Sequence, residues 1–589
     1  MRFFILCFLL SSVSMFSQED LLAKEYYKNG EFEKALSAYQ DLYRKSSNNN
    51  AYFLELIKTH QQLEQLDQAE TLLIKQMERI IYPALYVELG YNYQLKDNLE
   101  TANLNYNKAI TYIDENPNYA FSVGKFFENR SLLDQAVTTY EKAMAIKPEL
   151  NFNIQLARIY GEQGNVEKMF FSYLEFIGSN SSYLNTIKRA MSDFITENPE
   201  NENNILLRRV LLKKVQEEPN LLWNELLSWL FIQQKDYNKA FAQEKAIFNR
   251  QPESLSRIEE LAFIAMNDDA FDVAKNIFNY LAETAQNPDV QIGAHYNLLQ
   301  IDLKTQTDIK AIESTYLELF RTFGTTRQTI KLQIAYAHFL AFYKHDPLAA
   351  DLFLKESLKL PISDLEEGQV KLELGAILVL QEKFNEALIY FTQIQRNLKN
   401  STLAQEARFK VAQTSYYKGD FKWAESQLKI LKSSTSQLIA NDALDLMLLI
   451  TDNKFEDSTQ AGLTLYAKAD LMAFQNKPNE AISILNTVLE NYKGQSIEAQ
   501  ALYKQGQLFE ANKQYEKAET NYQMIVVNFK DGILADDAYF ALAELYEKHL
   551  QNPQKAKEFY EQIIFNHQDS IFFVEARKRF RELRGDAVN

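Results

Sequence analysis

The sequence predicts an all-α fold, a helical-repeat solenoid of roughly thirteen helix pairs. Glycine and proline are scarce, with 16 and 11 among 589 residues, which favours helices over a turn-rich β architecture. Small residues also recur about every 34 positions, as at Ala35, Ala69, Ala102 and Ala136. A period of this length indicates a helix–turn–helix unit that stacks on its neighbours.

The clearest single unit spans residues 120–148. Gly124 is followed by Ala136, Tyr140 and Ala143, and two antiparallel helices approach closely only where such small side chains leave room. We expect Tyr140 to fill the space beside that contact. The same offsets recur at Gly90, Tyr93, Ala102, Tyr106 and Ala109. Further along, Met169 replaces the small residue, so the sequence predicts a more widely spaced helix pair there.

These spacings resemble those of tetratricopeptide-repeat (TPR) proteins. The resemblance implies a right-handed superhelix of helix pairs that presents a groove to protein partners. The spacing by itself indicates only stacked helix pairs.

The pattern divides the chain into five segments. We interpret residues 1–17 as a signal peptide, 18–182 as an N-terminal repeat array and 183–220 as a degenerate helix pair without the Gly and Ala signature. Residues 221–364 form a middle array with irregular repeats. Residues 365–589 form a C-terminal array of longer period, closed by a basic helix that caps its open apolar end.

The N-terminal leader predicts export. Arg2 precedes a short apolar run, and small residues follow it, which is typical of a secretory signal peptide and too short to span a bilayer. Cleavage after Ser17 is preferred, with Ser14 as the alternative. Cys7 is the only cysteine and lies inside the leader. We therefore expect a periplasmic mature chain without disulfides, lipid anchor or transmembrane segment.

The repeats lengthen after residue 365. Ala387 and Ala424 are 37 positions apart, as are Ala481 and Ala518, but 57 positions separate Ala424 from Ala481. The excess predicts an additional helix near residues 437–450. This array resembles two periplasmic TPR proteins, the Tol-associated cell-division coordinator and the outer-membrane assembly lipoprotein BamD. The resemblance implies a role among envelope proteins, although the lipid-anchoring cysteine of BamD is absent.

Charge excludes some partners. The formal net charge of −16 disfavours nucleic acid, because phosphate binding needs a basic field. It favours basic partners, although acidity also keeps a large protein soluble. One compact basic patch comprises Arg208, Arg209, Lys213 and Lys214. We interpret it as a solvated helix face, with an anionic partner or lipid head group as the alternative.

No motif of an enzyme or cofactor site occurs in the sequence. His338 and His345 are seven residues apart and could share a helix face, but zinc needs further ligands. Asp268 and Asp269 are expected in a turn before a helix, where carboxylates favour the helix N-terminus. We therefore predict no catalytic, cofactor-binding or metal-binding residues, and no enzymatic activity.

The predicted function is a non-catalytic periplasmic scaffold or adaptor that binds envelope proteins through TPR grooves, in outer-membrane assembly or envelope maintenance. Peripheral association with outer-membrane complexes is consistent with this role. The alternative is an enzyme or a carbohydrate- or peptidoglycan-binding protein built on a helical solenoid.

The predicted partner-binding residues are Phe409, Gln413, Tyr503 and Gln507, because first-helix positions of this type face the groove in TPR proteins. The alternative is that these aromatic side chains pack between repeats. The corresponding groove-facing positions near the N-terminus are Tyr91, Phe121, Lys125 and Arg158.

Overall fold

The computed structural model describes residues 19–218, 220–305, 308–431, 437–454 and 460–586. Helices are the only regular secondary structure in these residues, so the predicted all-α repeat fold is confirmed. The predicted signal peptide, with Cys7 and both cleavage positions, lies outside the described residues. The chain divides into two compact units, residues 1–277 (unit 1) and 278–589 (unit 2).

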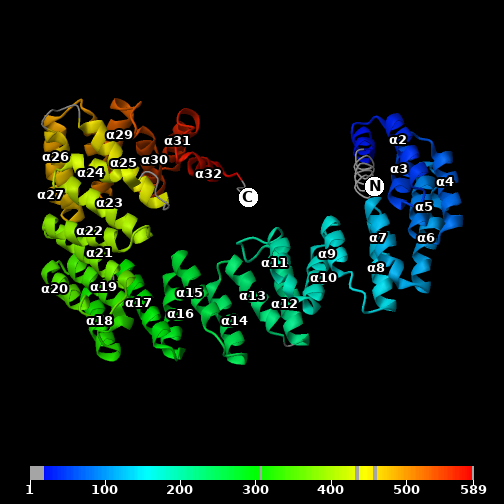
Figure 1. Ribbon diagram of the computed structural model, residues 1–589, viewed down its shortest axis with the longest axis horizontal. Coiled ribbons are helices and arrows are strands. Elements are labelled where there is room, and N and C mark those ends of the chain that lie inside the picture. The colour runs from blue at the N-terminus through cyan, green and yellow to red at the C-terminus, as the bar shows by residue number, and fades with distance from the viewer. Residues whose placement is uncertain (1–18, 219, 306–307, 432–436, 455–459, 587–589) are drawn as a thin grey trace, which may run out of the picture. The chain divides into compact units, whose positions relative to one another are not determined.

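Unit 1 begins with a helix over residues 19–28 and continues as successive helices (Figure 1). They are α2 (Phe32–Lys45), α3 (Asn50–Gln62), α4 (Leu66–Arg79), α5 (Ala84–Leu95), α6 (Leu99–Glu115), η1 (Pro117–Tyr119), α7 (Ala120–Asn129), α8 (Leu133–Ile146), α9 (Asn153–Glu162), α10 (Val166–Ser179), η2 (Ser181–Tyr183), α11 (Leu184–Ser192), α12 (Glu202–Glu217), α13 (Leu221–Gln233), α14 (Tyr237–Arg250) and α15 (Ser256–Asn267). The division between the units falls within α16 (Phe271–Thr284).

Unit 2 continues the all-helical pattern (Figure 1). Its helices are α17 (Pro288–Lys304), α18 (Ile309–Phe323), η3 (Arg327–Thr329), α19 (Ile330–His338), the π-helical turn η4 (Phe339–Tyr343), α20 (Pro347–Ser357), α21 (Asp364–Leu380), α22 (Phe384–Asn397), α23 (Thr402–Tyr417), α24 (Phe421–Leu431), α25 (Gln437–Asn453), α26 (Ala461–Phe474), α27 (Pro478–Asn491), α28 (Ser496–Ala511), α29 (Tyr515–Asn528), α30 (Ala535–Lys548), α31 (Pro553–Asn566) and α32 (Phe573–Arg584).

The turn inside each helix pair repeats one backbone conformation. In unit 1, residues with positive φ recur every 33 or 34 positions, at Gly30, Glu64, Asp97, Ser131 and Gly164. At each of these turns the N–H group of the next residue donates to the carbonyl five residues earlier, at 2.8–3.0 Å. This arrangement satisfies the last carbonyls of the first helix and ends it. The chain then starts the second helix of the pair.

Glycine on the first helix allows an aromatic ring of the second helix to lie against the backbone. Four such pairs are Gly90 with Tyr106, Gly124 with Tyr140, Gly375 with Phe391, and Gly506 with Tyr522. In each pair the aromatic residue follows the glycine by sixteen positions, and a Cβ atom on the glycine would lie only 2.4–2.5 Å from the ring. The close contact predicted between Gly124 and Tyr140 is therefore present, with Ala136 fully buried beside it.

The segment interpreted as a degenerate pair contains α11 and α12, joined by a non-helical link. A buried asparagine organises this link in place of the missing small residues. The Asn204 side chain donates to the carbonyls of Thr196 and Asn198, both at 2.7 Å, and accepts from the N–H of Thr196 at 3.2 Å.

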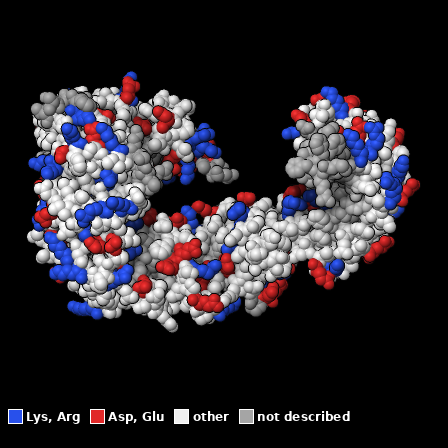
Figure 2. Space-filling model, viewed as in Figure 1, with Lys and Arg blue, Asp and Glu red and all other residues white. Residues whose placement is uncertain are grey.

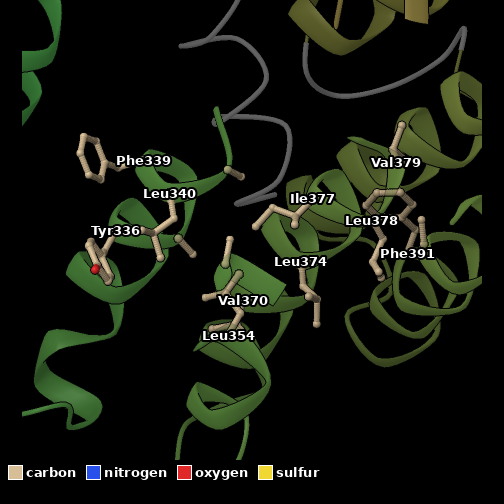
Figure 3. Packing of buried hydrophobic residues seen from close by; sticks show 14 of the residues in the cluster. Tyr336, Phe339, Leu340, Leu354, Val370, Leu374, Ile377, Leu378, Val379 and Phe391 are labelled. Atoms are coloured by element: carbon tan, nitrogen blue, oxygen red, sulfur yellow. The ribbon is translucent and has the colours of Figure 1, made fainter. Parts of the chain in front are cut away.

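An apolar cluster in unit 2 joins α19, η4, α20, α21 and α22, as Figure 3 shows. Its members include Tyr336, Phe339, Leu340, Leu354, Val370, Leu374, Ile377, Leu378, Val379 and Phe391. Helix α26 also packs against this cluster, through Leu471 and Met472. These contacts unite several helix pairs in one core.

The additional helix predicted near residues 437–450 is present as α25. Beyond it, α26 returns toward earlier helices of the unit. The Phe474 ring lies 5.7 Å from that of Phe342 and 6.0 Å from that of Tyr417, and Gln475 Nε2 donates to the Leu380 carbonyl at 3.1 Å. The insertion thus brings α26 against the C-terminal ends of α21 and α23. None of the described helices is long and apolar enough to cross a membrane.

Candidate partner-binding groove

Four first helices of unit 2, α17, α19, α21 and α23, line a cavity of about 470 Å³. This volume falls within the usual range of ligand pockets. Its apolar wall includes Leu303, Ile334, Leu372 and Leu403, one from each helix. No second helix of a pair contributes to the lining, so the cavity lies on the face formed by first helices, called here the inner face of unit 2.

Charged side chains surround the apolar wall. The Lys331 ammonium lies 4.1 Å from the centre of the Tyr296 ring. His338 Nδ1 lies 2.9 Å from Glu373 Oε1. Glu406 lines the cavity and is half-buried. Within the described part of the chain, the Glu406 carboxylate forms no hydrogen bond or ion pair, so it is available to a ligand.

The π-helical turn η4 borders this cavity. π-helical turns are rare and frequently mark functional sites. The His338 ring stacks on that of Phe342 at 4.5 Å, and Tyr343 also lines the cavity. The helix ends before His345, which has φ +56°. His338 and His345 therefore do not share a helix face, and that part of the sequence interpretation is wrong because the π turn intervenes.

The structure places Phe409 and Gln413 one turn apart on α23. Phe409 is half-buried against an apolar cluster of α23, α24, α25 and α26. Gln413 is also half-buried and accepts a hydrogen bond from Lys410 Nζ at 3.2 Å. Burial lowers the pKa of Lys410, although Glu406, Glu373 and Asp442 act in the opposite direction.

Tyr503 and Gln507 lie one turn apart on α28, and burial raises the pKa of Tyr503 while Gln507 acts to lower it. Gln507 is exposed, whereas Tyr503 is half-buried with its ring 5.7 Å from that of Tyr522. Tyr503 packs on a different apolar cluster from Phe409. Helices α25 and α26 each pack against both α23 and α28. The structure therefore brings each predicted pair together but leaves the two pairs on separate helices with α25 and α26 between them.

Carboxylates extend from the cavity along α25 to α30. The charge of Asp442 acts to raise the pKa of Lys410 on α23. The charge of Asp445 likewise acts to raise the pKa of Asp537 on α30. Burial raises the pKa of Asp445, and the neighbouring Asp442 adds to this effect. Burial also raises the pKa of Asp537 to about 6, with Asp536 and Asp445 contributing. Like charges in a poorly solvated position disfavour ionisation.

Replacing Asp537 by asparagine should stabilise unit 2 above pH 6. The folded-state pKa of about 6 exceeds that of an unfolded aspartate, about 3.9, so folding takes up a proton between these values. The unfavourable contribution of Asp537 is absent below about pH 4 and complete above about pH 6. We expect D537N to gain about 1 kcal/mol at pH 7.5, allowing for solvent screening, and nothing at pH 4.

Urea unfolding at pH 4, 5, 6 and 7.5 measures this difference. D531N, which alters an exposed carboxylate in the preceding loop, is the control. Parallel pH profiles for wild type and D537N would contradict the assignment of a raised pKa.

Of the N-terminal groove-facing positions, three belong to ion-pair or cation–π contacts within unit 1. The Arg130 guanidinium lies 4.1 Å from the centre of the Tyr91 ring. Lys125 and Arg158 both pair with Glu128. Phe121 is 56% exposed. This face of unit 1 is therefore largely occupied by its own charge pairs.

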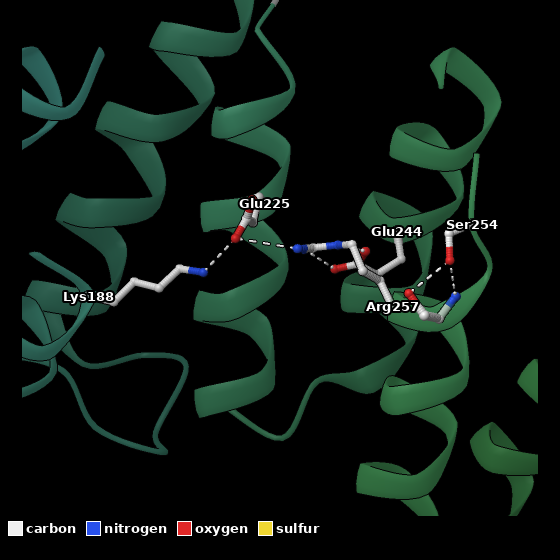
Figure 4. A network of polar contacts seen from close by, with 6 residues as sticks. Lys188, Glu225, Glu244, Ser254 and Arg257 are labelled. Atoms are coloured by element: carbon white, nitrogen blue, oxygen red, sulfur yellow. Dashed lines mark hydrogen bonds and ion pairs between the residues drawn. The ribbon is translucent and has the colours of Figure 1, made fainter. Parts of the chain in front are cut away.

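A second network in unit 1 joins α11, α13, α14 and α15 (Figure 4). Lys188 Nζ lies 2.8 Å from Glu225 Oε1, and Arg257 lies 3.3 Å from the same atom. Arg257 also donates two hydrogen bonds of 2.8 Å to the buried Glu244. Burial acts to raise the pKa of Glu225, but Lys188 and Arg257 outweigh it and lower the pKa. Internal partners satisfy these charges, which indicates a structural role.

Most of the predicted basic patch is also ion-paired. Arg209 lies 4.0 Å from Glu167, Lys213 lies 3.7 Å from Glu217, and Lys214 pairs with Glu175. Figure 2 shows Lys, Arg, Asp and Glu side chains interspersed over the visible face. These pairs agree with the interpretation of the patch as a solvated helix face.

The acidic turn of unit 1 has a local role. Asp268 accepts a hydrogen bond of 2.5 Å from the Tyr237 hydroxyl. This bond lowers the pKa of Asp268, and the nearby Lys235 ammonium lowers it further. No group of three or more His, Cys, Asp or Glu side chains among the described residues could hold a metal ion.

The sequence interpretation missed Glu373 and Glu406 as groove residues. Helical register could have identified them. Tyr503 precedes Gly506 by three positions, and Leu372 precedes Gly375 by the same offset, so Glu373 is the neighbour of a groove position. Glu406 precedes Phe409 by three positions, which places both on one helix face.

Comparisons with known proteins identify repeats in the part of unit 2 that follows the cavity residues. Two family models, both described as tetratricopeptide repeat, match residues 466–533 and 537–570. These two stretches are tetratricopeptide repeats. They cover α27, α28, α29 and α31 completely and most of α26 and α30, and they include Tyr503 and Gln507. No curated protein gives a significant match to the sequence.

Three solved structures similar to this chain are 12% identical to it in sequence. One is Naa15/Naa10 bound to HypK-THB, with a TM-score of 0.29 and coverage of 97% of this chain and 94% of that one. Another is the APC/C hetero-tetramer Cut9-Hcn1, with a TM-score of 0.19 and 96% of both chains covered. The third is the P58(IPK) TPR domain, with a TM-score of 0.19 and coverage of 69% and 98%.

Proposed function

We propose that this protein is a non-catalytic scaffold that binds other proteins through the inner face of unit 2. The observation that carries the proposal is the cavity built from the first helices of four successive pairs and the adjoining turn η4. Such a surface offers an apolar pocket with polar groups at its edge, the arrangement that anchors a partner side chain. The tetratricopeptide repeats at 466–570 support a protein–protein interaction role.

The finer part of the proposal is an exported protein that acts in the periplasm on proteins of the cell envelope. The short apolar leader with Arg2 before it supports export. The resemblance of the long-period array to periplasmic TPR proteins supports an envelope partner, in outer-membrane assembly or envelope maintenance. Fold likeness alone does not identify that partner.

Photocrosslinking from single positions in living cells tests this function. A photoreactive residue replaces Gln300 or Gln369, which both line the cavity of the inner face, in the full-length protein. Lys422 and Glu516, which are exposed on the second helices α24 and α29, provide matched control positions. We expect the inner positions to capture a defined set of envelope proteins that the control positions do not capture.

Two outcomes would contradict the proposal. Equal capture of the same proteins from inner and control positions would show that the inner face is not the binding surface. Capture restricted to cytoplasmic proteins would contradict export.

A further inference from the structure

The inner face of unit 2 has an excess of negative charge next to its apolar cavity. Glu373 and Glu406 line the cavity, and Asp442, Asp445 and Asp537 continue the series across α25 and α30. Among the described residues, Lys331 lines the same cavity, and Lys410 is influenced electrostatically by Glu373, Glu406 and Asp442.

Neither ammonium group neutralises these carboxylates by direct contact. Lys331 lies over the Tyr296 ring, and the hydrogen bond from Lys410 goes to the Gln413 amide. Asp442, Asp445 and Asp537 form no ion pair within the described residues. Glu373 has a partner in His338, but the other four carboxylates form no ion pair among the described residues. Glu406 and Asp537 are half-buried and Asp442 and Asp445 are exposed, so most acidic groups of this face lack a counterion from the protein itself.

A buried hydroxyl group near the cavity also lacks a hydrogen-bond partner among the described residues. The Tyr316 side chain is fully buried, and its hydroxyl has no hydrogen-bond partner in the described structure. Burial raises the pKa of Tyr316, and the phenol groups of Tyr296 and Tyr343 add to this effect. Both of these tyrosines line the cavity. A buried hydroxyl without a partner is costly. This region therefore combines an apolar wall, an unsatisfied hydroxyl close behind it and unpaired carboxylates.

We propose that this face selects a cationic protein segment in which an apolar side chain lies beside lysine or arginine. The apolar side chain enters the cavity between α19 and α21, while the cations pair with Glu406 and with Asp442 and Asp445 of α25. This inference rests on the proposed function and specifies the partner's chemistry. Charge complementarity of this kind provides specificity and speeds association, whereas like charges exclude acidic segments.

Peptide binding to the mature chain, residues 18–589, tests the inference by fluorescence anisotropy. The probes are three labelled twelve-residue peptides: one of leucine and lysine, one with glutamate in place of lysine, and one with glycine in place of leucine. The double variant E373Q/E406Q alters the cavity. The double variant E356Q/E516Q removes two exposed carboxylates on α20 and α29 and has the same net charge.

The leucine–lysine peptide should bind best, and its affinity should fall with salt. It should fall about tenfold or more in E373Q/E406Q and remain near the wild-type value in E356Q/E516Q. Equal losses in both double variants would show only non-specific attraction to an acidic protein and would overturn the inference. Equal binding of the glutamate peptide would also overturn it.

These outcomes are separable from those of the proposed function. If inner-face crosslinks persist but their partners present acidic segments, the scaffold function stands and the inference about partner chemistry fails. If the inner-face positions capture no specific protein but the leucine–lysine peptide still binds as expected, the site has the inferred chemistry without the proposed cellular role.

Discussion

Replacing Gly506 by alanine is expected to destabilise the α28–α29 pair by about 2 kcal/mol, because overpacking in a closed interface costs about 1–3 kcal/mol. The new Cβ atom would lie 2.5 Å from Cε1 of Tyr522. The Tyr522 ring is 1% exposed and has no free space into which to rotate. The helices must therefore separate, and the loss begins at this interface because each repeat contacts mainly its neighbours.

Gly293 on α17 supplies the matched control. A Cβ atom at this position meets no atom within 4 Å, so alanine there should stabilise the helix by up to about 1 kcal/mol through propensity alone. Hydrogen exchange measured at several urea concentrations resolves the two helix pairs separately. Similar protection of α28 and α29 in G506A and wild type would contradict the close contact.

A double-mutant cycle tests whether the ring is the cause. Where alanine occupies the position of the glycine, at Ala412 and Ala469, the residue sixteen positions later is leucine, at Leu428 and Leu485. The cost of G506A should therefore be smaller in a Y522L background than in wild type, giving a coupling energy above about 0.5 kcal/mol. Additive effects would place the strain elsewhere.

The contacts within helix pairs were predictable because they depend on residue types at short, fixed spacing. Gly124, Ala136 and Tyr140 illustrate this, since a small residue and a ring at fixed spacing imply a close helix contact. The turns were less visible. Glu64 and Asp97 adopt the same left-handed conformation as Gly30. Glycine at such a turn can be recognised in the sequence, whereas a non-glycine residue there does not indicate this conformation.

The additional helix α25 was predictable from the long gap between Ala424 and Ala481, but its consequences were not. The return of α26 to α21 depends on contacts such as Gln475 with the Leu380 carbonyl, 95 residues apart. No local pattern encodes such a contact. The cavity has the same origin, because its walls come from four helices whose adjacency is set by the whole array.

Arg130 in unit 1 also makes contacts between distant helices that no sequence motif indicated. Arg130 follows α7 and donates through Nε to Glu88 on α5 at 3.2 Å and through a terminal nitrogen to Gln61 on α3 at 2.9 Å. A second hydrogen bond to Glu88 makes the pair bidentate, and the Glu88 side chain is only 5% exposed. One side chain thus connects the first helices of three successive pairs.

Replacing Arg130 by alanine should destabilise unit 1 by about 3–5 kcal/mol, because it leaves a buried carboxylate without a counterion. The control is R158A. Arg158 is 52% exposed, and its partner Glu128 keeps hydrogen bonds from Lys125 at 3.0 Å and the Tyr140 hydroxyl at 2.7 Å. We expect R158A to cost at most about 1 kcal/mol.

Urea unfolding followed by circular dichroism, with hydrogen exchange of α3 and α5, compares the two variants. The double variant R130M/E88M should recover most of the stability lost in R130A, since apolar side chains replace a buried ion pair at little cost. A loss in R130A no greater than in R158A would show that Glu88 reaches solvent after the substitution. Failure of R130M/E88M to recover would instead mean that the hydrogen bond to Gln61, rather than the charge of Glu88, holds the three helices together.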